Sequence, residues 1–166
     1  MIDQTTFLFS TGNWPLSRAI RALTSSTVSH CGIGLTVAGV RLVADASLLG
    51  VEMVTRERWF AGKRVLAEYM VPEDVAPTHS YVLGELGKGY DYSGMFGYMP
   101  IFMARWMHRR IANPWASPSR VVCSEFIVRG LQARSDTWAA MDPEECPPEQ
   151  LMKMCLGMFT RVWPSA

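Results

Sequence analysis

Cys123 lies where a helix is expected to begin, a position that favours the reactive form of a cysteine. The preceding Pro118 and Ser119 are typical of a helix start. Apolar residues then recur at helical spacing: Val122, Phe126, Ile127 and Leu131. Unpaired backbone N–H groups and the helix dipole stabilise a thiolate in the first turn. Cys123 is therefore a candidate nucleophile, although a free cysteine is more often buried in a core than catalytic.

A nucleophilic thiol needs a base, and His30 is the favoured histidine. His79 falls within a predicted surface helix and His108 within a basic cluster, so both are expected to be solvated. His30 begins a segment, 30–37, that alternates with the period of a strand. Its face of that strand otherwise carries two glycines and a threonine, which predicts open space beside the imidazole. The alternative is a polar residue that simply ends a strand.

Asp45 is the candidate for a third group that would hold the imidazole in one tautomer. It lies inside the otherwise apolar segment 42–46, where a carboxylate must find a partner or be desolvated. A turn near Ala38 and Gly39 predicts a hairpin that pairs this strand with the His30 strand. Asp45 and His30 are then expected on one face. The alternative is an edge-strand aspartate that faces water.

The other cysteines have less favourable contexts. Cys31 adjoins His30, but successive side chains of a strand point to opposite faces, so Cys31 is predicted to be core. Cys146 and Cys155 lie among prolines and on an apolar helix, away from a helix start. The sequence has no C-x-x-C spacing, so reduced thiols are expected and neither a metal nor a cofactor is predicted.

The elements that must position these residues predict one α+β domain spanning residues 1–166, with a small antiparallel sheet packed against helices. Strands are expected at 6–10, 30–37, 41–47, 48–54, 64–71 and 158–163. Helices are expected from Pro15, at 55–60, at 74–87, at 95–110, near Cys123 and from Pro148. Residues 87–94 are expected to form a loop.

Composition excludes several classes of function. The chain has 166 residues, of which 49% are hydrophobic and 19% charged, as in a globular protein. A net charge of +1 gives no basis for nucleic-acid binding. Six tryptophans and eleven methionines indicate a deep core or an apolar groove. The N-terminal residues do not resemble a signal peptide, and the longest apolar run is too short to span a bilayer, so a cytoplasmic location is expected.

Three segments together resemble one known superfamily. They are Ser17–Arg21 leading into Val28–Gly34, then Val43–Ala46 with Gly50–Val51, and then Val122–Phe126. Weaker matches are Gly89–Asp91 and Pro147–Leu151. The combination resembles the circularly permuted branch of the NlpC-type, papain-like superfamily, which includes the YiiX-like proteins and, more remotely, relatives of lecithin retinol acyltransferase.

The resemblance implies a circularly permuted papain-like (NlpC-like) fold and assigns three catalytic roles. Cys123 would be the nucleophile, His30 the base and Asp45 the residue that orients His30. The order His, acid, Cys is the most specific feature of the match, and Asp45 departs from the glutamate that is usual in the family. Tyr90 would line the substrate pocket or donate to the oxyanion; alternatively it packs on the core.

The implied activity is that of a cysteine peptidase or amidase that forms a thioester on Cys123, with cell-wall peptides as the first substrate hypothesis. An acyltransferase, lipid amidase or thioesterase is the second. A non-catalytic component of a phage or secretion system, exported by such a route, is the third. The partner is expected to be a peptide or an acyl amide or ester. Segment 92–107 would contact a membrane surface or form a core helix. The sequence does not predict an oligomeric state.

Overall fold

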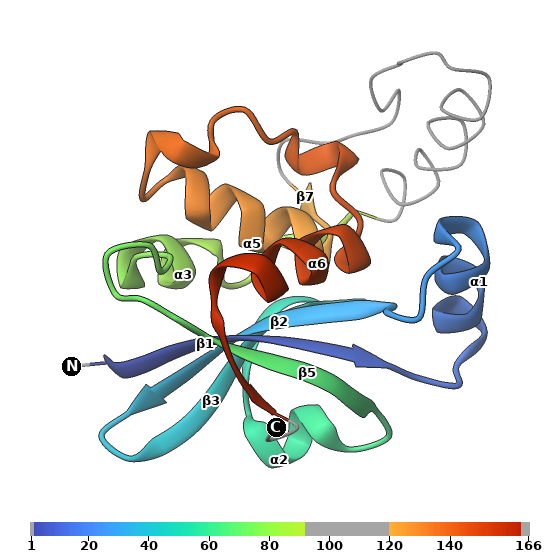
Figure 1. The fold of residues 1–166 in the computed structure, drawn as a ribbon. Helices are drawn as coiled ribbons and strands as arrows, with labels where there is room; N and C mark the ends of the chain where they lie inside the picture. The colour runs from blue at the N-terminus through green and yellow to red at the C-terminus, as the bar shows by residue number, and fades with distance from the viewer. Residues whose placement is uncertain (1, 92–119, 164–166) are drawn as a thin grey trace.

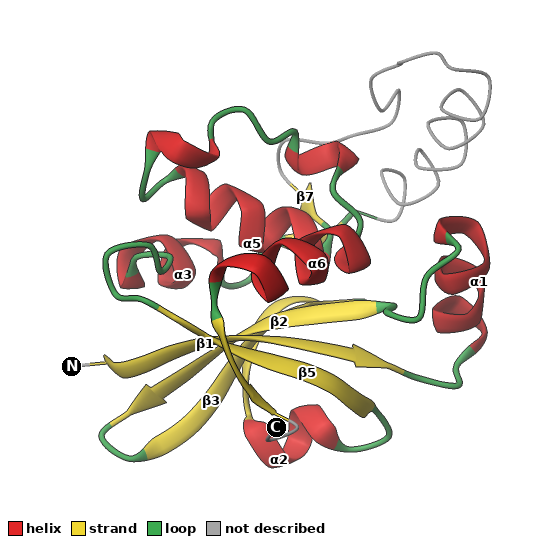
Figure 2. Ribbon diagram, viewed as in Figure 1, coloured by secondary structure: helices red, strands yellow, loops and turns green. Residues whose placement is uncertain are grey.

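The computed structural model describes residues 2–91 and 120–163, which form an α+β structure (Figure 1). Within these residues, a six-stranded antiparallel sheet has the order β4-β3-β2-β1-β5-β8 and is accompanied by five helices. Two of the helices, α5 and α6, lie across one face of the sheet, and α2 lies on the other (Figure 2). The predicted α+β class and antiparallel sheet are confirmed.

The element bounds follow the expected order closely. The sheet contains β1 (Ile2–Thr11), β2 (His30–Val37), β3 (Val40–Ser47), β4 (Gly50–Thr55), β5 (Arg64–Val71) and β8 (Thr160–Trp163). The helices are α1 (Pro15–Thr24), α2 (Arg56–Phe60), α3 (His79–Glu85), α5 (Cys123–Gln132) and α6 (Pro148–Met158). Short 3-10 turns follow α5 at Asp136–Trp138 and Pro143–Glu145. A separate parallel pair joins β6 (Gly89–Tyr90) to β7 (Arg120–Val121).

Alternation along the strands divides the buried side chains between two cores. The larger core lies between the sheet and helices α5 and α6, and includes Phe7, Phe9, Cys31, Ile33, Phe126, Ile127 and Leu151. The smaller core lies under α2 and consists of Leu8, Val43, Val54 and Trp59. Because each fully buried large apolar side chain contributes about 1.5–3 kcal/mol, the larger core dominates the stability of the fold. The smaller core fixes α2 against the face of the sheet that carries His30.

The β2–β3 hairpin determines which residues meet. Its turn residues, Ala38 and Gly39, both have positive φ (49° and 78°), as in the two-residue turns that match strand twist. The register pairs Ile33 with Ala44 and Gly34 with Val43. Since side chains alternate along each strand, Asp45 lies on the same face as His30, which confirms the predicted hairpin and shared face.

Three expectations about element bounds are wrong. The helix predicted over 74–87 begins at His79, because the Thr78 side chain accepts a hydrogen bond from the Tyr81 N–H (3.2 Å) and caps it there. Pro77 precedes this cap, and its ring disfavours the helical conformation at Ala76, the residue before it. The strand predicted over 6–10 extends back to Ile2, and the loop predicted over 87–94 contains β6.

No helix in the described ranges is long and apolar enough to cross a membrane. Several expectations fall outside those ranges. They are the helix predicted at 95–110, the membrane contact predicted at 92–107, the position of His108 and the helix-start signal at Pro118 and Ser119.

Candidate active site

Cys123 is the first residue of α5, as the helix-start pattern indicates. The preceding Val122 is the N-cap residue, and its backbone N–H donates to Glu125 Oε2 at 3.1 Å. The next N–H groups of the first turn point out of the N-terminal end of α5, as in any helix. Cys123 is 4% exposed. A buried sulfur at a helix N-terminus lies in a field that favours its anionic form.

Glu125 is a further titratable group in this first turn. It is buried and forms an ion pair with Arg129, with 2.5 Å between Oε1 and Nη2. Burial raises the pKa of the Glu125 carboxyl to about 7, although Arg129 and the Val122 N–H oppose the rise. Its hydrogen bond to Val122 fixes the backbone just before Cys123.

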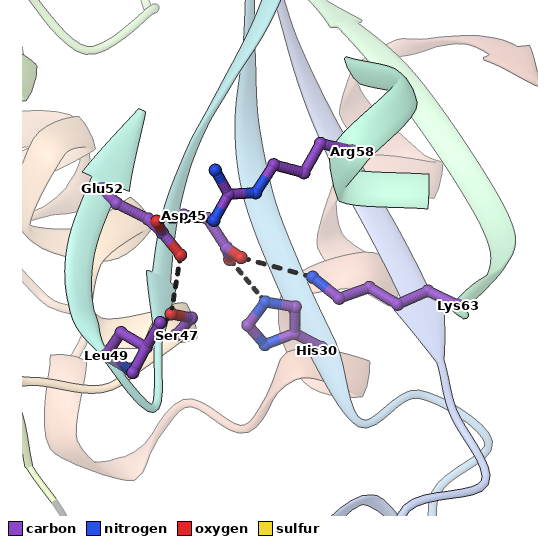
Figure 3. A network of polar contacts seen from close by, with 7 residues as sticks. All are labelled: His30, Asp45, Ser47, Leu49, Glu52, Arg58 and Lys63. Carbon is purple, nitrogen blue, oxygen red and sulfur yellow. Dashed lines mark hydrogen bonds and ion pairs between the residues drawn. The ribbon is translucent and has the colours of Figure 1, made fainter. Parts of the chain in front are cut away.

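His30 and Asp45 meet across the β2–β3 pair. His30 Nε2 lies 2.5 Å from Asp45 Oδ1, and Figure 3 shows the imidazole directed at the carboxylate. The Asp45 side chain is 4% exposed and that of His30 18%. Asp45 is on an interior strand between β2 and β4, so the alternative of a water-facing edge aspartate is wrong.

Lys63 is a second partner of Asp45 that the sequence did not indicate. It follows α2, and its Nζ lies 3.2 Å from Asp45 Oδ2, the carboxylate oxygen next to the one that His30 contacts (Figure 3). The same Nζ lies 4.4 Å from the centre of the Trp59 ring, and Trp59 also stacks on His30 with 5.9 Å between ring centres. Asp45 is therefore held between two cationic side chains that share one aromatic neighbour.

Trp59 also corrects the expectation of open space beside His30. A side chain added at Gly32 would meet Val43 at 3.0 Å and the Trp59 indole at 3.4 Å. The space beside Gly32 is therefore filled by Val43 and Trp59, and the space beside Gly34 by Thr6 and Leu8. The Trp59 N–H lies near enough to Asp45 to lower the pKa of that carboxyl, but it forms no hydrogen bond with the described residues.

The three predicted site residues favour a charged resting state. Burial would lower the pKa of His30, but the charges of Asp45 and Cys123 outweigh it and raise that pKa to about 10. Burial would raise the pKa of Asp45, but His30 and Lys63 lower it to about 2. Between these values Asp45 is a carboxylate and His30 an imidazolium.

Cys123 is the anionic partner of that imidazolium. A hydrogen bond from the Cys31 thiol lowers the pKa of Cys123 well below its ordinary value; burial opposes this change, and the charge of His30 adds to it. His30 Nε2 is already engaged by Asp45, which leaves Nδ1 for exchange of a proton with the sulfur. The lowered pKa of Cys123 and the raised pKa of His30 both favour a thiolate–imidazolium pair.

Cys31 is a fully buried member of the larger core, as predicted, but it also contacts Cys123. Burial and the neighbouring thiolate raise the pKa of Cys31 well above normal, so it acts as a neutral S–H donor. The alternation argument placed Cys31 on the face opposite His30 and did not reveal this contact. Both residues reach Cys123 because α5 begins over the end of β2.

The remaining candidates are separated from this cluster or lie at its edge. His79 is exposed at the start of α3, as expected for a solvated histidine. Cys155 is buried in α6, and burial raises its pKa to about 12. Tyr90 is buried in β6 and lines a cavity of about 390 Å³ together with His30 and Lys63. A role for Tyr90 in substrate binding stays a prediction.

No protein-family model matches this sequence, and no curated protein matches it. The site therefore has to be interpreted from its own chemistry. Within residues 2–91 and 120–163, no group of three or more His, Cys, Asp or Glu side chains is arranged to hold a metal ion. What the cluster does provide is an activated sulfur nucleophile, a proton donor beside it and a carboxylate that fixes the donor, which is the set of groups that acyl transfer requires.

Proposed function

We propose that the protein is a cysteine hydrolase that cleaves amides or esters through Cys123, His30 and Asp45, in a circularly permuted papain-like fold. The observation that supports this most strongly is the contact of an anionic Cys123, at a helix start, with an imidazolium that Asp45 holds at 2.5 Å. The order of the three residues along the chain agrees with the proposed permutation. A residue set that served packing alone would not require a carboxylate behind the histidine.

The proposed reaction has two steps. The Cys123 thiolate attacks the carbonyl carbon, and the C–N or C–O bond breaks as His30 gives its proton to the leaving group. Water then attacks the thioester; His30 takes a proton from the water, the C–S bond breaks, and the acid product leaves. This returns the thiolate and the imidazolium. Backbone N–H groups at the start of α5 are positioned to stabilise the oxyanion of both steps.

The substrate hypotheses differ in what they require beside the nucleophile. A cell-wall peptidase or amidase needs a groove that accepts a polar and charged peptide. An acyl ester or amide hydrolase, or an acyltransferase, needs an apolar recess. The cavity beside His30 is lined mainly by apolar groups, which favours the second class over the first. A non-catalytic component would have no use for a low thiol pKa at Cys123.

The test is the pH dependence of cysteine alkylation by iodoacetamide, followed by mass spectrometry of each site. Cys123 is expected to react with a midpoint well below pH 9, while Cys155, whose pKa is raised to about 12, stays unlabelled at neutral pH. His30→Ala should return the Cys123 midpoint toward that of an ordinary thiol. Equal labelling of the cysteines with an ordinary thiol pKa would contradict the proposal.

A panel of activated esters and amides then tests turnover. The native protein is expected to release the leaving group with an initial burst, because the thioester forms before it is hydrolysed. Cys123→Ala should lose both the burst and the steady rate. Cys155→Ala is the matched control, since it removes a buried thiol from α6 without touching the proposed nucleophile.

A further inference from the structure

We infer that the cavity beside His30 binds a medium-sized apolar acyl group, so that the substrate is a hydrophobic acyl ester or amide. This inference rests on the proposed function and specifies its substrate class. The cavity has a volume of about 390 Å³, near the lower end of the roughly 300–1,000 Å³ typical of small-molecule sites. One wall carries His30 and another is formed by α1, so a bound acyl group would extend from the site toward that helix.

The α1 wall is apolar. Leu16 and Ile20, one helical turn apart, both line the cavity, and Trp14 and Pro15 continue this surface at the start of the helix. Across the cavity lie Ala46 and Leu48, at the end of β3 and in the turn that follows. The cationic groups of the lining, His30 and Lys63, are already paired with Asp45, so a charged stem peptide would be desolvated against the α1 wall, whereas a hydrocarbon group would gain from the same burial.

The rim of the cavity leaves apolar side chains in water. Trp14 is 74% exposed and Leu48 is 47% exposed, although both line the cavity. They belong to different segments, the start of α1 and the β3–β4 turn. Exposed large apolar residues that gather around one recess, rather than scatter singly, mark a binding surface.

Two buried hydroxyl groups in the lining of the cavity lack hydrogen-bond partners among the described residues. Ser10 is fully buried and Thr11 is 6% exposed; both line the cavity, and neither side-chain hydroxyl has a hydrogen-bond partner in the described part of the chain. Ser10 is also the register partner of His30 across β1 and β2. Both hydroxyl oxygens are buried and do not reach a bound molecule, so the reacting carbonyl of the substrate belongs between His30 and the start of α5, with its tail against α1.

The wall is fixed before any ligand binds. Ser17 of α1 is hydrogen-bonded to Ser29, the residue before His30, and accepts a hydrogen bond from the Gly12 N–H at 3.1 Å. These bonds tie α1 to the ends of β1 and β2. A cavity whose wall is joined directly to the His30 strand holds an acyl group in a defined position relative to the imidazole.

The test compares alkylation of Cys123 by N-methyl, N-butyl and N-octyl iodoacetamide, each corrected for its rate with glutathione. The rate at low probe concentration is expected to rise about twofold to fourfold for each added methylene until the cavity is filled. Ile20→Trp should remove most of the gain of the octyl probe over the methyl probe, because the indole fills the cavity beside α1. Leu83→Trp, on the exposed face of α3, is the matched control. Circular dichroism and thermal unfolding show whether each variant is folded.

The outcomes separate this inference from the proposed function. Fast, His30-dependent labelling of Cys123 with no dependence on chain length would overturn the apolar acyl group and leave the hydrolase standing. Labelling of Cys123 no faster than of an ordinary thiol would overturn the hydrolase itself. A chain-length dependence that Ile20→Trp does not change would place the acyl group outside this cavity and overturn the inference. The same series of acyl p-nitrophenyl esters, from acetyl to octanoyl, should give the same order in kcat/KM.

Discussion

Two buried carboxylates on the same face of the sheet are built from nearly the same parts. Asp45 is paired with His30, and Glu68 with Arg56. The carboxylate side chains are 4% and 6% exposed, and their two cationic partners are each 18% exposed. In each assembly a cation lies over a ring of α2: Lys63 over Trp59 at 4.4 Å, and Arg56 over Phe60 at 4.6 Å.

The two assemblies differ in whether the cationic partner can give up its proton. Arg56 donates two parallel hydrogen bonds to Glu68, at 2.6 and 2.5 Å, and Thr6 donates a third at 2.8 Å. A guanidinium keeps its proton at any physiological pH. His30 has one nitrogen on Asp45 and another free for Cys123, and an imidazolium can give its proton away.

We propose that this difference separates a structural ion pair from a reactive one. Burial and pairing of a carboxylate are common to both, so neither indicates chemistry. What distinguishes Asp45 is that its partner can titrate and also contacts a nucleophile.

Replacing the titratable partner should have the largest effect on reactivity. His30→Ala is expected to lower Cys123-dependent turnover by roughly 10²–10⁴-fold, the usual contribution of a positioned acid–base group. Ester hydrolysis near pH 7 provides the measurement. Arg56→Ala, which removes the equivalent cation from the other assembly, should leave the rate per folded molecule unchanged; a comparable loss there would remove the distinction.

Removing one partner of the matched pair should instead affect stability. Arg56→Met is expected to lower the free energy of unfolding by about 3–5 kcal/mol, because Glu68 is left buried without its counter-charge. Urea denaturation measures the change. The double variant Arg56→Met with Glu68→Leu should recover most of the loss. A double variant as unstable as the single one would show that the pair itself, rather than its charge balance, holds the fold.

Asp45→Asn should produce an intermediate loss of turnover, about 10–100-fold at neutral pH, since an amide holds the imidazole in a less suitable tautomer and no longer stabilises its charge. The Cys123 pKa should rise as the His30 pKa falls. Both changes appear in the pH profile of iodoacetamide labelling. An unchanged profile would mean that Asp45 serves the fold in the way that Glu68 does.

Stability should depend on alkaline pH through the His30 assembly. The His30 pKa is raised to about 10, so the pairing contributes fully below the ordinary histidine value of about 6.5 and is lost as pH rises through about 10. Urea unfolding at pH 6, 8 and 10.5 should show a decline in the native protein and a flatter profile in His30→Gln. The Arg56 pair should not contribute to this decline, because its cation does not titrate there.

Lys63→Met should have the smallest effect, a several-fold fall in turnover with a modest rise in the Asp45 pKa. Lys63 pairs with the Asp45 oxygen that His30 does not contact, and no contact between Lys63 and Cys123 is found among the described residues. Lys63→Arg should restore turnover, because it keeps both the charge and the contact with Trp59. A variant with arginine that remains as slow as the methionine variant would exclude an electrostatic role.

Local patterns predicted the elements that depend on local signals. The bounds of β2 and β5 agree with the alternation in the sequence, and α2 begins after Thr55, whose side chain accepts a hydrogen bond from the Arg58 N–H. The same alternation placed His30 and Asp45 on one face. Elements that exist through tertiary contacts were missed: β6 and β7 have two residues each and are strands only because they pair with each other.

The site was predictable where it followed strand and helix geometry. Cys123 at a helix start, and His30 with Asp45 on a hairpin, could be placed in this way. The contacts of Lys63 and Cys31 depend on how α2 and α5 pack against the sheet, which the sequence pattern does not specify. Glu68 also interrupts an apolar strand, as Asp45 does, but its partner is Arg56. A carboxylate in such a strand is therefore a weak signal without knowledge of its partner.

The neighbouring positions of His30 and Cys31 make pairing register a condition of reactivity. A slip of β2 by one residue would move the His30 imidazole to the face of the sheet that carries the larger core and the Cys31 thiol to the opposite face. Gly34 helps to fix the register, because a slip would place a residue with a side chain at its position, where that side chain would collide with Thr6 and Leu8 of β1. A substitution at Gly34, four residues along the strand from His30, is therefore expected to favour a folded molecule in which β2 pairs with β1 in the wrong register. The proposed activity would then depend on a glycine that takes no part in the proposed chemistry.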